Sequence, residues 1–363
     1  MLSRFVSAAG RTALILGCVA IVATVVSAAL RMVGASEIAV FVATAVALAS
    51  LAAVVGEATE ELGARLGPGA TGVLQSALGN LPELFISIFA LQAGLVVVVQ
   101  TALIGSILAN TLLVLGLAFF VGGVRHGPQR FGADTTRMTA MLLVLSVASL
   151  AIPTLATAPG APDFGHARDL SVISSLVLLV IFIASIPSSI RGTFGPSRDE
   201  HAAPSSWPLR VSIIVLAVAG LGAALVSDWF VEALRPAMAG LGLSEEFVGL
   251  VVVAIAGNAV ENVVGITAAA RNQADLAVSL ILNSSLQVAL LLIPALVLIS
   301  ILIGGPGLTL VAPLLLIAAL GLAAILAALI VFDGESTYIE GLALIGLYVI
   351  IAASVWYGPP LPG

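Results

Sequence analysis

Two acidic motifs of the same form lie inside long apolar stretches of the sequence. One occupies residues 79–83 (GNLPE) and the other residues 257–261 (GNAVE). A charge in the hydrocarbon core of a bilayer is costly, so a Glu within an apolar span indicates a functional site by default. A single Glu could instead be a protonated or hydrogen-bonded link between helices. Because Glu83 and Glu261 each follow an Asn by three residues, the matched pair favours a binding site.

The residues near both glutamates carry oxygen atoms that suit a hard cation. Asn80 and Asn258 precede the glutamates by one helical turn, which places amide and carboxylate on one helix face. Gly79, Pro82 and Gly257 weaken the helix there, so that backbone carbonyls are available as ligands. A polar patch follows each motif and adds neutral oxygens from Ser106, Asn110, Ser284 and Gln287.

This set of oxygens matches Ca²⁺, which takes about six to eight hard oxygen ligands. Na⁺ accepts the same kind of ligand, and these residues do not separate the two ions. Zn²⁺ and Cu⁺ are disfavoured, because they prefer imidazole or thiolate ligands. The histidines fall in predicted loops and the single cysteine is far from both motifs; these residues are His126, His166, His201 and Cys18.

The same carboxyl groups suggest how transport could be coupled to protons. A carboxyl group in a medium of low dielectric constant readily takes up a proton when no cation neutralises it. Ca²⁺ would then have to displace protons in order to bind. Two Glu residues accommodate one Ca²⁺ or two H⁺ without net charge, so competition at Glu83 and Glu261 is sufficient for antiport if only the neutralised site changes sides.

A second acidic cluster consists of Glu57, Glu60 and Glu61, at the predicted cytoplasmic end of an apolar stretch. The three residues lie on one helix face, and Arg65 follows Glu61 by one turn. The cluster is either a solvated helix end with an ion pair or an access route for cations or protons. A looser acidic counterpart in the second half comprises Asp228 and Glu232.

The composition identifies the environment in which these residues act. Of 363 residues, 60% are hydrophobic and 9% are charged, against about 25% charged in an ordinary soluble domain. This excludes a soluble enzyme, a disordered chain and a nucleic-acid-binding protein. Apolar runs close to the length of a membrane helix recur from end to end, whereas a β-barrel would alternate polar and apolar residues. We therefore predict an all-α integral membrane protein in a lipid bilayer.

The apolar runs predict eleven membrane spans joined by short connections. They cover residues 12–30, 37–62, 70–93, 97–122, 138–156, 170–190, 209–231, 247–270, 274–303, 307–331 and 336–357. The first run follows Arg4 and Arg11 as a signal peptide would, but it is long enough to span and no clear cleavage site follows it. We interpret it as a retained helix.

The arginines predict the orientation of the chain. All 13 basic residues are arginine, and cytoplasmic loops carry the excess of positive charge. With eleven spans, all but Arg31, Arg168 and Arg235 fall on the side of the N-terminus. We predict a cytoplasmic N-terminus and an external C-terminus. The absence of lysine and the abundance of Ala, Gly and Arg suggest a bacterial source, and hence the bacterial plasma membrane.

The two halves of the chain repeat. We divide it into a leading helix (1–35), a first five-helix repeat (36–191), a linker (192–208) and a second five-helix repeat (209–363). Because five is odd, the second repeat must be inverted relative to the first. Inverted repeats with polar, Gly-containing breaks at matching positions are typical of secondary transporters, with the binding site at the midplane.

At these residues the chain resembles the cation/Ca²⁺ exchanger superfamily and, within it, the H⁺/Ca²⁺ exchanger (cation/proton exchanger) branch. The resemblance covers most of the chain after the first span. It rests on residues 58–62 (ATEEL), 79–83, 105–110 (GSILAN), 257–261, 284–287 (SSLQ) and 333–341 (DGESTYIEG). It implies a leading helix plus two inverted repeats. It also implies that Glu83 and Glu261 bind the cation and that the site is lined by Asn80, Asn258, Ser106, Ser284 and Gln287.

Three features differ from the pattern of that branch. Asn262 stands where the branch usually carries a His, and an Asn cannot titrate as a proton relay does. Pro82 replaces a small residue, which predicts a sharper helix break. In place of a long acidic segment between the halves, residues 192–208 carry only Asp199 and Glu200 as acidic residues.

The leading hypothesis is a secondary active antiporter that exchanges Ca²⁺ for H⁺, not an enzyme, with no cofactor beyond the transported ions. Asn262 keeps open the same fold exchanging Na⁺ or K⁺, as a Na⁺/H⁺, K⁺/H⁺ or Na⁺/Ca²⁺ exchanger. A cation channel also stays open. A membrane-embedded enzyme is disfavoured, because the predicted spans hold no His and no His-Glu-x-x-His motif. The predicted partners are lipid and inorganic cations, and the oligomeric state is left open.

Overall fold

The computed structural model describes residues 11–66, 74, 78–161, 165–190, 207–304 and 307–357. The predicted linker at 192–208 lies outside the described residues except for Trp207 and Pro208. Most of residues 70–77, where the third predicted span begins, also lie outside them.

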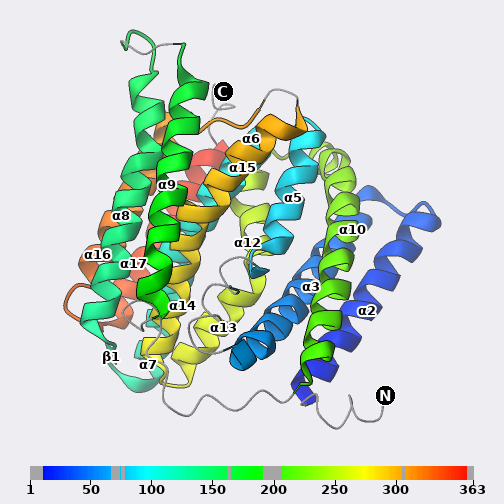
Figure 1. Cartoon of the computed structure of the whole chain (residues 1–363), viewed down its shortest axis with the longest axis horizontal. Helices are drawn as coiled ribbons and strands as arrows, with labels where there is room; N and C mark the ends of the chain where they lie inside the picture. Colours follow the sequence, from blue (N-terminus) through cyan, green and yellow to red (C-terminus); the bar gives the residue numbers. More distant parts are fainter. Residues whose placement is uncertain are drawn as a thin grey trace. The chain divides into compact units, whose positions relative to one another are not determined.

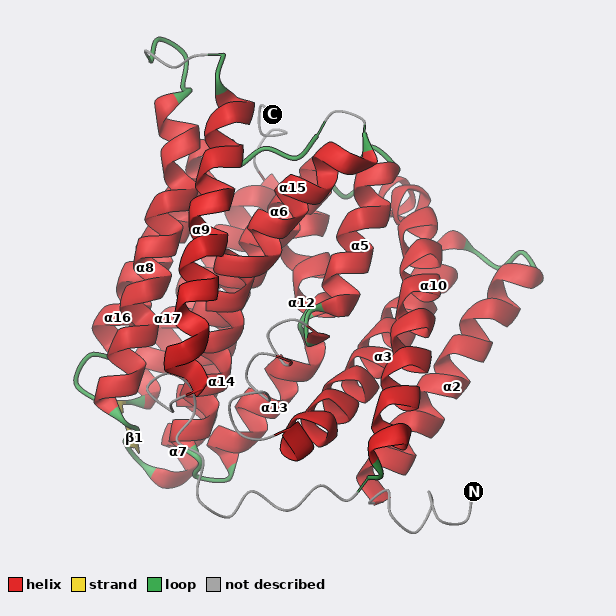
Figure 2. Cartoon of the chain, in the orientation of Figure 1, coloured by secondary structure: helices red, strands yellow, loops and turns green. Residues whose placement is uncertain are grey.

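Helices make up nearly all of the described structure (Figures 1 and 2). Their bounds are α2 Arg11–Met32, α3 Glu37–Leu66, α5 Leu81–Gln92, α6 Val96–Leu108, α7 Leu115–His126, α8 Ala133–Ala156, α9 Ala167–Ile190, α10 Leu209–Leu241, α11 Glu245–Phe247, α12 Ala254–Gly257, α13 Ala259–Ala270, α14 Ala274–Gln287, α15 Ile293–Ile303, α16 Leu314–Ile330 and α17 Tyr338–Tyr357. The π-helical segments are η1 Ala109–Val114, η2 Val248–Val253 and η3 Val288–Leu292.

Within the described residues, 8 helices are long and apolar enough to cross a membrane, or 9 if one bent pair, Glu245–Gly257 with Ala259–Ala270, is a single span. Two further apolar helices are shorter: α5 has 12 residues and α16 has 17, against about 20 for a full span. The helical, membrane-spanning character that the composition predicts is confirmed.

Two short strands were not predicted from the sequence. β1 (Gln129–Arg130) pairs antiparallel with β2 (Glu335–Ser336). Arg130 Nε also donates to Glu335 Oε2 at 3.2 Å on the surface. Two residues are too few to produce the alternating pattern by which a strand is recognised in a sequence.

The contacts divide the chain into two compact units. Unit 1 consists of Met1–Ala93, Arg198–Leu243 and Ala256–Val260. Unit 2 consists of Gly94–Ser197, Ser244–Ile255 and Glu261–Gly363. The boundary between them passes through α12 and α13, so the GNAVE motif contributes to both units.

Unit 1 is built on the long helices α3 and α10, with α2 packed against α3 (Figure 1). Phe41 and Phe230 stack between α3 and α10 with their ring centroids 5.0 Å apart. Gly222 gives Leu51 room at the same interface, because a Cβ on this glycine would lie 3.2 Å from the Leu51 side chain. The opposite face of α2 exposes apolar side chains such as Ile21, as expected for contact with lipid.

Unit 2 brings helices together through glycine. A Cβ on Gly105 of α6 would collide with the main chain of Leu250, and a Cβ on Gly249 would collide with the main chain of α6. α7 and α17 meet in the same way at Gly116 and Gly341. Small residues that allow close backbone approach are typical of helix packing in membranes.

The connection between α15 and α16 is a non-helical segment, residues 308–312, within the range predicted as a span at 307–331. Its backbone groups are satisfied by side chains of other helices. The N–H of Leu310 donates to Ser171 Oγ at 2.9 Å, and its carbonyl accepts from Thr154 Oγ1 at 3.1 Å. Backbone without helical bonds is tolerated at membrane depth when protein groups satisfy it in this way.

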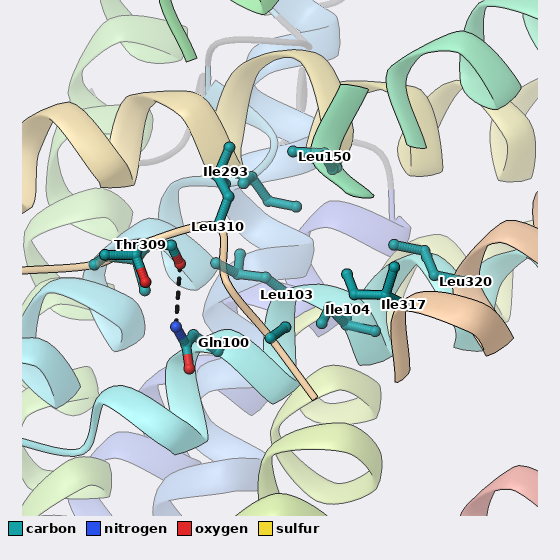
Figure 3. Close-up of a pocket in the computed structure, with 11 residues that line it drawn as sticks. Gln100, Leu103, Ile104, Leu150, Ile293, Thr309, Leu310, Ile317 and Leu320 are labelled. Atoms are coloured by element: carbon teal, nitrogen blue, oxygen red, sulfur yellow. Dashed lines mark hydrogen bonds between the residues drawn. The ribbon is translucent and has the colours of Figure 1, made fainter. Parts of the chain in front are cut away.

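Gln100 of α6 holds the same segment from another side. Its Nε2 donates to the carbonyl oxygens of Thr309 and Val311, at 3.1 Å each, and Figure 3 shows the bond to Thr309. The remaining side chains around this segment line an apolar pocket, among them Leu103, Ile104 and Leu320 (Figure 3). Gln100 is therefore a polar residue of an apolar span with a structural role.

Candidate cation site

Glu83 lies in the first turn of α5, with 8% of its surface exposed. Pro82 occupies one of the first two helical positions, where its missing N–H has no helical partner to lose. Asn80, 7% exposed, is the residue immediately before the helix. An acidic side chain in the first turn also interacts favourably with the positive end of the helix dipole.

The motif of the second half contacts Glu83 directly. Asn258, fully buried between α12 and α13, donates a hydrogen bond from Nδ2 to Oε1 of Glu83. Gly257 lies against the same side chain, because a Cβ built on it would be 2.9 Å from Glu83 Cγ and 3.0 Å from Oε1. All three residues belong to unit 1. The glutamate of the first motif thus lies against the glycine and asparagine of the second motif.

The polar patches that follow the motifs meet in unit 2. Asn110, in η1, donates from Nδ2 to Ser284 Oγ of α14 at 3.0 Å. Ser106, on α6, is also buried, and Gln287 is half-buried at the last position of α14. The sequence analysis placed these residues around one site, and the structure brings Asn110 and Ser284 into direct contact.

A π-helical segment begins within or directly after each polar patch. η1 begins at Ala109, within the first patch, and η3 begins at Val288, directly after Gln287. π-Bulges inside α-helices occur frequently at functional sites, because they turn backbone and side chains out of the regular helical order. Nothing in the composition of these segments signals a π-helix, so sequence reasoning did not find them.

Glu261 lies in the first turn of α13 and is half-buried. The helix axis bends by 64° between Glu245–Gly257 and Ala259–Ala270, with Asn258 at the break. The predicted helix break at the second motif is present. Glu261 belongs to unit 2, whereas Glu83, Asn80 and Asn258 belong to unit 1.

The next residue, Asn262, is 8% exposed, and its Oδ1 atom is buried. Within the part of the chain that the structure describes, this oxygen has no hydrogen-bond partner. No group of three or more His, Cys, Asp and Glu side chains that could hold a metal ion occurs among the described residues. The candidate ligands are therefore single glutamates with neutral amide and hydroxyl groups around them.

Glu61 of the second acidic cluster and the nearby Arg65 have a structural role. Glu61 Oε2 accepts from the backbone N–H of Trp207 at 3.1 Å, and Arg65 Nε donates to the carbonyl of Trp207 at 2.6 Å. Both side chains therefore bind the main chain of one residue, just before α10. Glu57 is half-buried and Glu60 is exposed. An access role for the cluster stays a prediction.

The acidic residues of α10 face outward. Asp228 and Glu232 are exposed, and Glu232 forms an ion pair with Arg31 of α2 at 2.5 Å. The Arg31 guanidinium also lies 5.0 Å from the centre of the Trp229 ring. This pair links α2 to α10 within unit 1.

A carboxylate at a helix start and an amide at a helix break, buried together inside an apolar helical fold, define a membrane protein of the secondary-transporter class. The sequence matches the family described as "Sodium/calcium exchanger protein" over residues 36–190 and 211–357, and the chain belongs to this family.

Individual relatives agree with this assignment. The chain is 34% identical over 360 residues to a protein of Synechocystis sp. named "Ca(2+)/H(+) antiporter", with 92% of this chain and 95% of the relative covered. It is 35% identical over 323 residues to "Ca(2+)/H(+) antiporter ChaA" of Bacillus subtilis, with 86% and 90% covered. The solved structure titled "Structure of native YfkE" superposes with a TM-score of 0.80 at 30% identity, with 94% of this chain and 99% of that chain covered.

Proposed function

We propose that this protein is a secondary active antiporter that exchanges Ca²⁺ for H⁺ by alternating access. The observation that carries the proposal is the environment of Glu83. This residue is a buried carboxylate at a helix start, and it accepts a hydrogen bond from Asn258 of the other motif. Ca²⁺/H⁺ antiport is the activity named for relatives that cover most of this chain.

Glu83 and Glu261 supply the charged ligands in this proposal. Each lies in the first turn of its helix, and a helix break precedes Glu261, where released backbone carbonyls add ligands. The neutral ligands are Asn80, Asn258, Ser106, Asn110, Ser284 and Gln287. Two carboxylates hold either one Ca²⁺ or two H⁺, so the occupied site is neutral in both forms. Glu57 and Glu60 lie on the access route, and Glu61 also fixes Trp207.

The proposed membrane arrangement is that of eleven spans in two inverted five-helix repeats after a leading helix. The repeats are residues 36–191 and 209–363, with 1–35 as the leading helix and 192–208 as the linker. The bias of the arginines supports a cytoplasmic N-terminus and an external C-terminus. The protein then acts in the plasma membrane of a bacterium.

The test is uptake of ⁴⁵Ca²⁺ into proteoliposomes under an imposed pH gradient. We expect the wild type to take up Ca²⁺ and Glu83→Gln and Glu261→Gln each to lose uptake by more than about 100-fold. Changing a residue that only orients a metal ligand costs about 10- to 100-fold. The expected loss is larger here, because Gln keeps the size of the ligand itself but not its charge. Glu37→Gln is the matched control, since Glu37 is exposed at the start of α3.

Two results would overturn the proposal. Uptake that depends on Na⁺ or K⁺ and not on the pH gradient would assign different ions to the same fold. Flux that rises linearly with Ca²⁺, without saturation or exchange, would identify a channel.

A further inference from the structure

Gly257 limits the room for the Glu83 side chain. A Cβ at position 257 would lie 2.9 Å from Cγ, 3.0 Å from Oε1 and 3.4 Å from Cδ of Glu83. Contacts this short to two of the three atoms cannot be accommodated without movement in a close-packed interior. Because Gly257 has no side chain, the Glu83 carboxylate lies closer to position 257 than another residue there would allow.

We propose that Gly257 is a specificity-determining residue that sets the size of the transported cation through the position of the Glu83 carboxylate. The inference rests on the proposed function, in which Glu83 binds the cation, and it assigns a role that concerns selectivity. Gly257 lies against Glu83 and would act through it, so it is a positioning residue.

Two neighbours from the second motif limit the position of the Glu83 side chain. Asn258 Nδ2 donates to Oε1, and the Cβ position of Gly257 lies close to Cγ and Oε1. Pro82, next to Glu83, fixes the local backbone at the start of α5. A methyl group at 257 would therefore push the carboxylate away from position 257, and the inference is that this shift brings it closer to the bound cation.

The displacement is of the size that separates divalent cations. Ca²⁺ binds oxygen at about 2.3–2.6 Å, whereas Mg²⁺ requires about 2.0–2.1 Å. Moving one carboxylate forward by a few tenths of an ångström, about the difference between these ranges, closes the site around a smaller ion. Mn²⁺ is the appropriate probe, because it also accepts carboxylate, carbonyl and water oxygens.

The experiment measures how unlabelled Mn²⁺, Ca²⁺ and Sr²⁺ inhibit ⁴⁵Ca²⁺ uptake by wild-type and Gly257→Ala proteoliposomes. We expect Gly257→Ala to lower the ratio of the Mn²⁺ to the Ca²⁺ inhibition constant by about tenfold, equivalent to about 1.4 kcal/mol. Sr²⁺, which is larger than Ca²⁺, becomes a poorer inhibitor. An unchanged ratio overturns the inference.

Gly222→Ala is the matched control for added bulk in unit 1, because its Cβ meets an apolar Leu51 atom at 3.2 Å. Gly321→Ala controls for the substitution itself, since nothing lies within 4 Å of its Cβ position. Both variants are expected to keep the wild-type ratio. The same shift of the ratio in Gly222→Ala would overturn the inference, because general overpacking would then explain it.

A rescue variant keeps the inference falsifiable if Gly257→Ala is inactive or fails to fold. Glu83→Asp shortens the side chain by one methylene and so makes room for a methyl group at position 257. We expect Gly257→Ala/Glu83→Asp to bind Ca²⁺ more tightly than Gly257→Ala, measured by the rise in melting temperature with Ca²⁺ in detergent. A double variant no better than Gly257→Ala would overturn the inference.

The role of Glu83 and the role of Gly257 can be refuted separately. If Glu83→Gln keeps wild-type uptake, the proposed role of Glu83 is wrong, and the inference falls with it. If Glu83→Gln is inactive and Gly257→Ala keeps the wild-type ion ratio, the proposed function stands and only the role of Gly257 is wrong.

Discussion

Two buried amides of this protein bind polar side chains that are far away in the sequence. Asn258 binds Glu83, and Asn110 binds Ser284 at 3.0 Å. In an environment without water, a polar group that loses its partner keeps the full cost of its desolvation. The pairs therefore stabilise the fold at the same positions where we propose that they supply oxygens for a cation.

The Asn110–Ser284 pair allows these two roles to be separated. We expect Ser284→Ala to lower the free energy of unfolding by about 1–3 kcal/mol, because the amide of Asn110 loses its acceptor. Asn110→Leu combined with Ser284→Ala should recover part of this stability, since both polar groups are then removed. Ca²⁺ affinity should fall in both variants.

Thermal unfolding in detergent, with and without Ca²⁺, measures both quantities. Ser146→Ala is a matched control, since Ser146 is a buried hydroxyl that bonds only within its own helix in the described structure. A double variant that recovers stability together with Ca²⁺ affinity would contradict a ligand role for this pair.

At the residue scale, the sequence indicates which residues carry chemistry more reliably than it indicates which residues are in contact. The apolar surroundings of Glu83 and Glu261 are enough to single them out, because charge is rare in such spans. The partner of each side chain depends on the tertiary fold. An ion pair between Glu61 and Arg65 at a solvated helix end was one of two interpretations of the sequence, and it did not include Trp207, whose main chain both side chains bind from more than 140 positions away.

At the scale of elements, the helices follow from apolar length, whereas their interruptions do not. Each predicted range overlaps a helix, but α16 begins only at Leu314. The residues before it are as apolar as the helix itself, so hydropathy cannot tell them apart. The backbone of the non-helical segment at 308–312 is bound by side chains from α6, α8 and α9, and these contacts depend on the tertiary fold.

Gln100 tests the importance of this segment. Gln100→Leu would leave the carbonyls of Thr309 and Val311 without their donor, and we expect a loss of about 2–6 kcal/mol of stability at about 1–3 kcal/mol for each carbonyl. Ca²⁺ affinity measured on the folded fraction should be unchanged, because Gln100 is not a proposed ligand. Thermal unfolding checks the first expectation and Ca²⁺ titration the second.

Gln92→Leu provides the control, since Gln92 is exposed at the end of α5. A Gln100→Leu variant as stable as Gln92→Leu would show that water or a shifted backbone satisfies these carbonyls. A fall in Ca²⁺ affinity would instead indicate that the segment positions the site.

At the scale of the whole molecule, orientation is the property that only the complete sequence can predict. No single loop decides it, but all 13 basic residues are arginines and nearly all fall on one predicted side. Helix contacts carry no information on which side is cytoplasmic, because packing is the same in either orientation. The two compact units, in turn, were not predicted, since they follow contacts and not chain order.

The ends of α8 offer a direct test of orientation. Asp134 lies in the first turn of this helix and His166 lies in the connection after it, and both are exposed. α8 has 24 residues, or about 36 Å at about 1.5 Å per residue, enough to cross the hydrocarbon. The arginine bias predicts Asp134 on the cytoplasmic side and His166 outside.

In a Cys18→Ala background, a membrane-impermeant maleimide added to intact cells should label His166→Cys and reach Asp134→Cys only after permeabilisation. The reverse pattern would invert the topology, and labelling of both residues from outside would mean that α8 does not span the membrane.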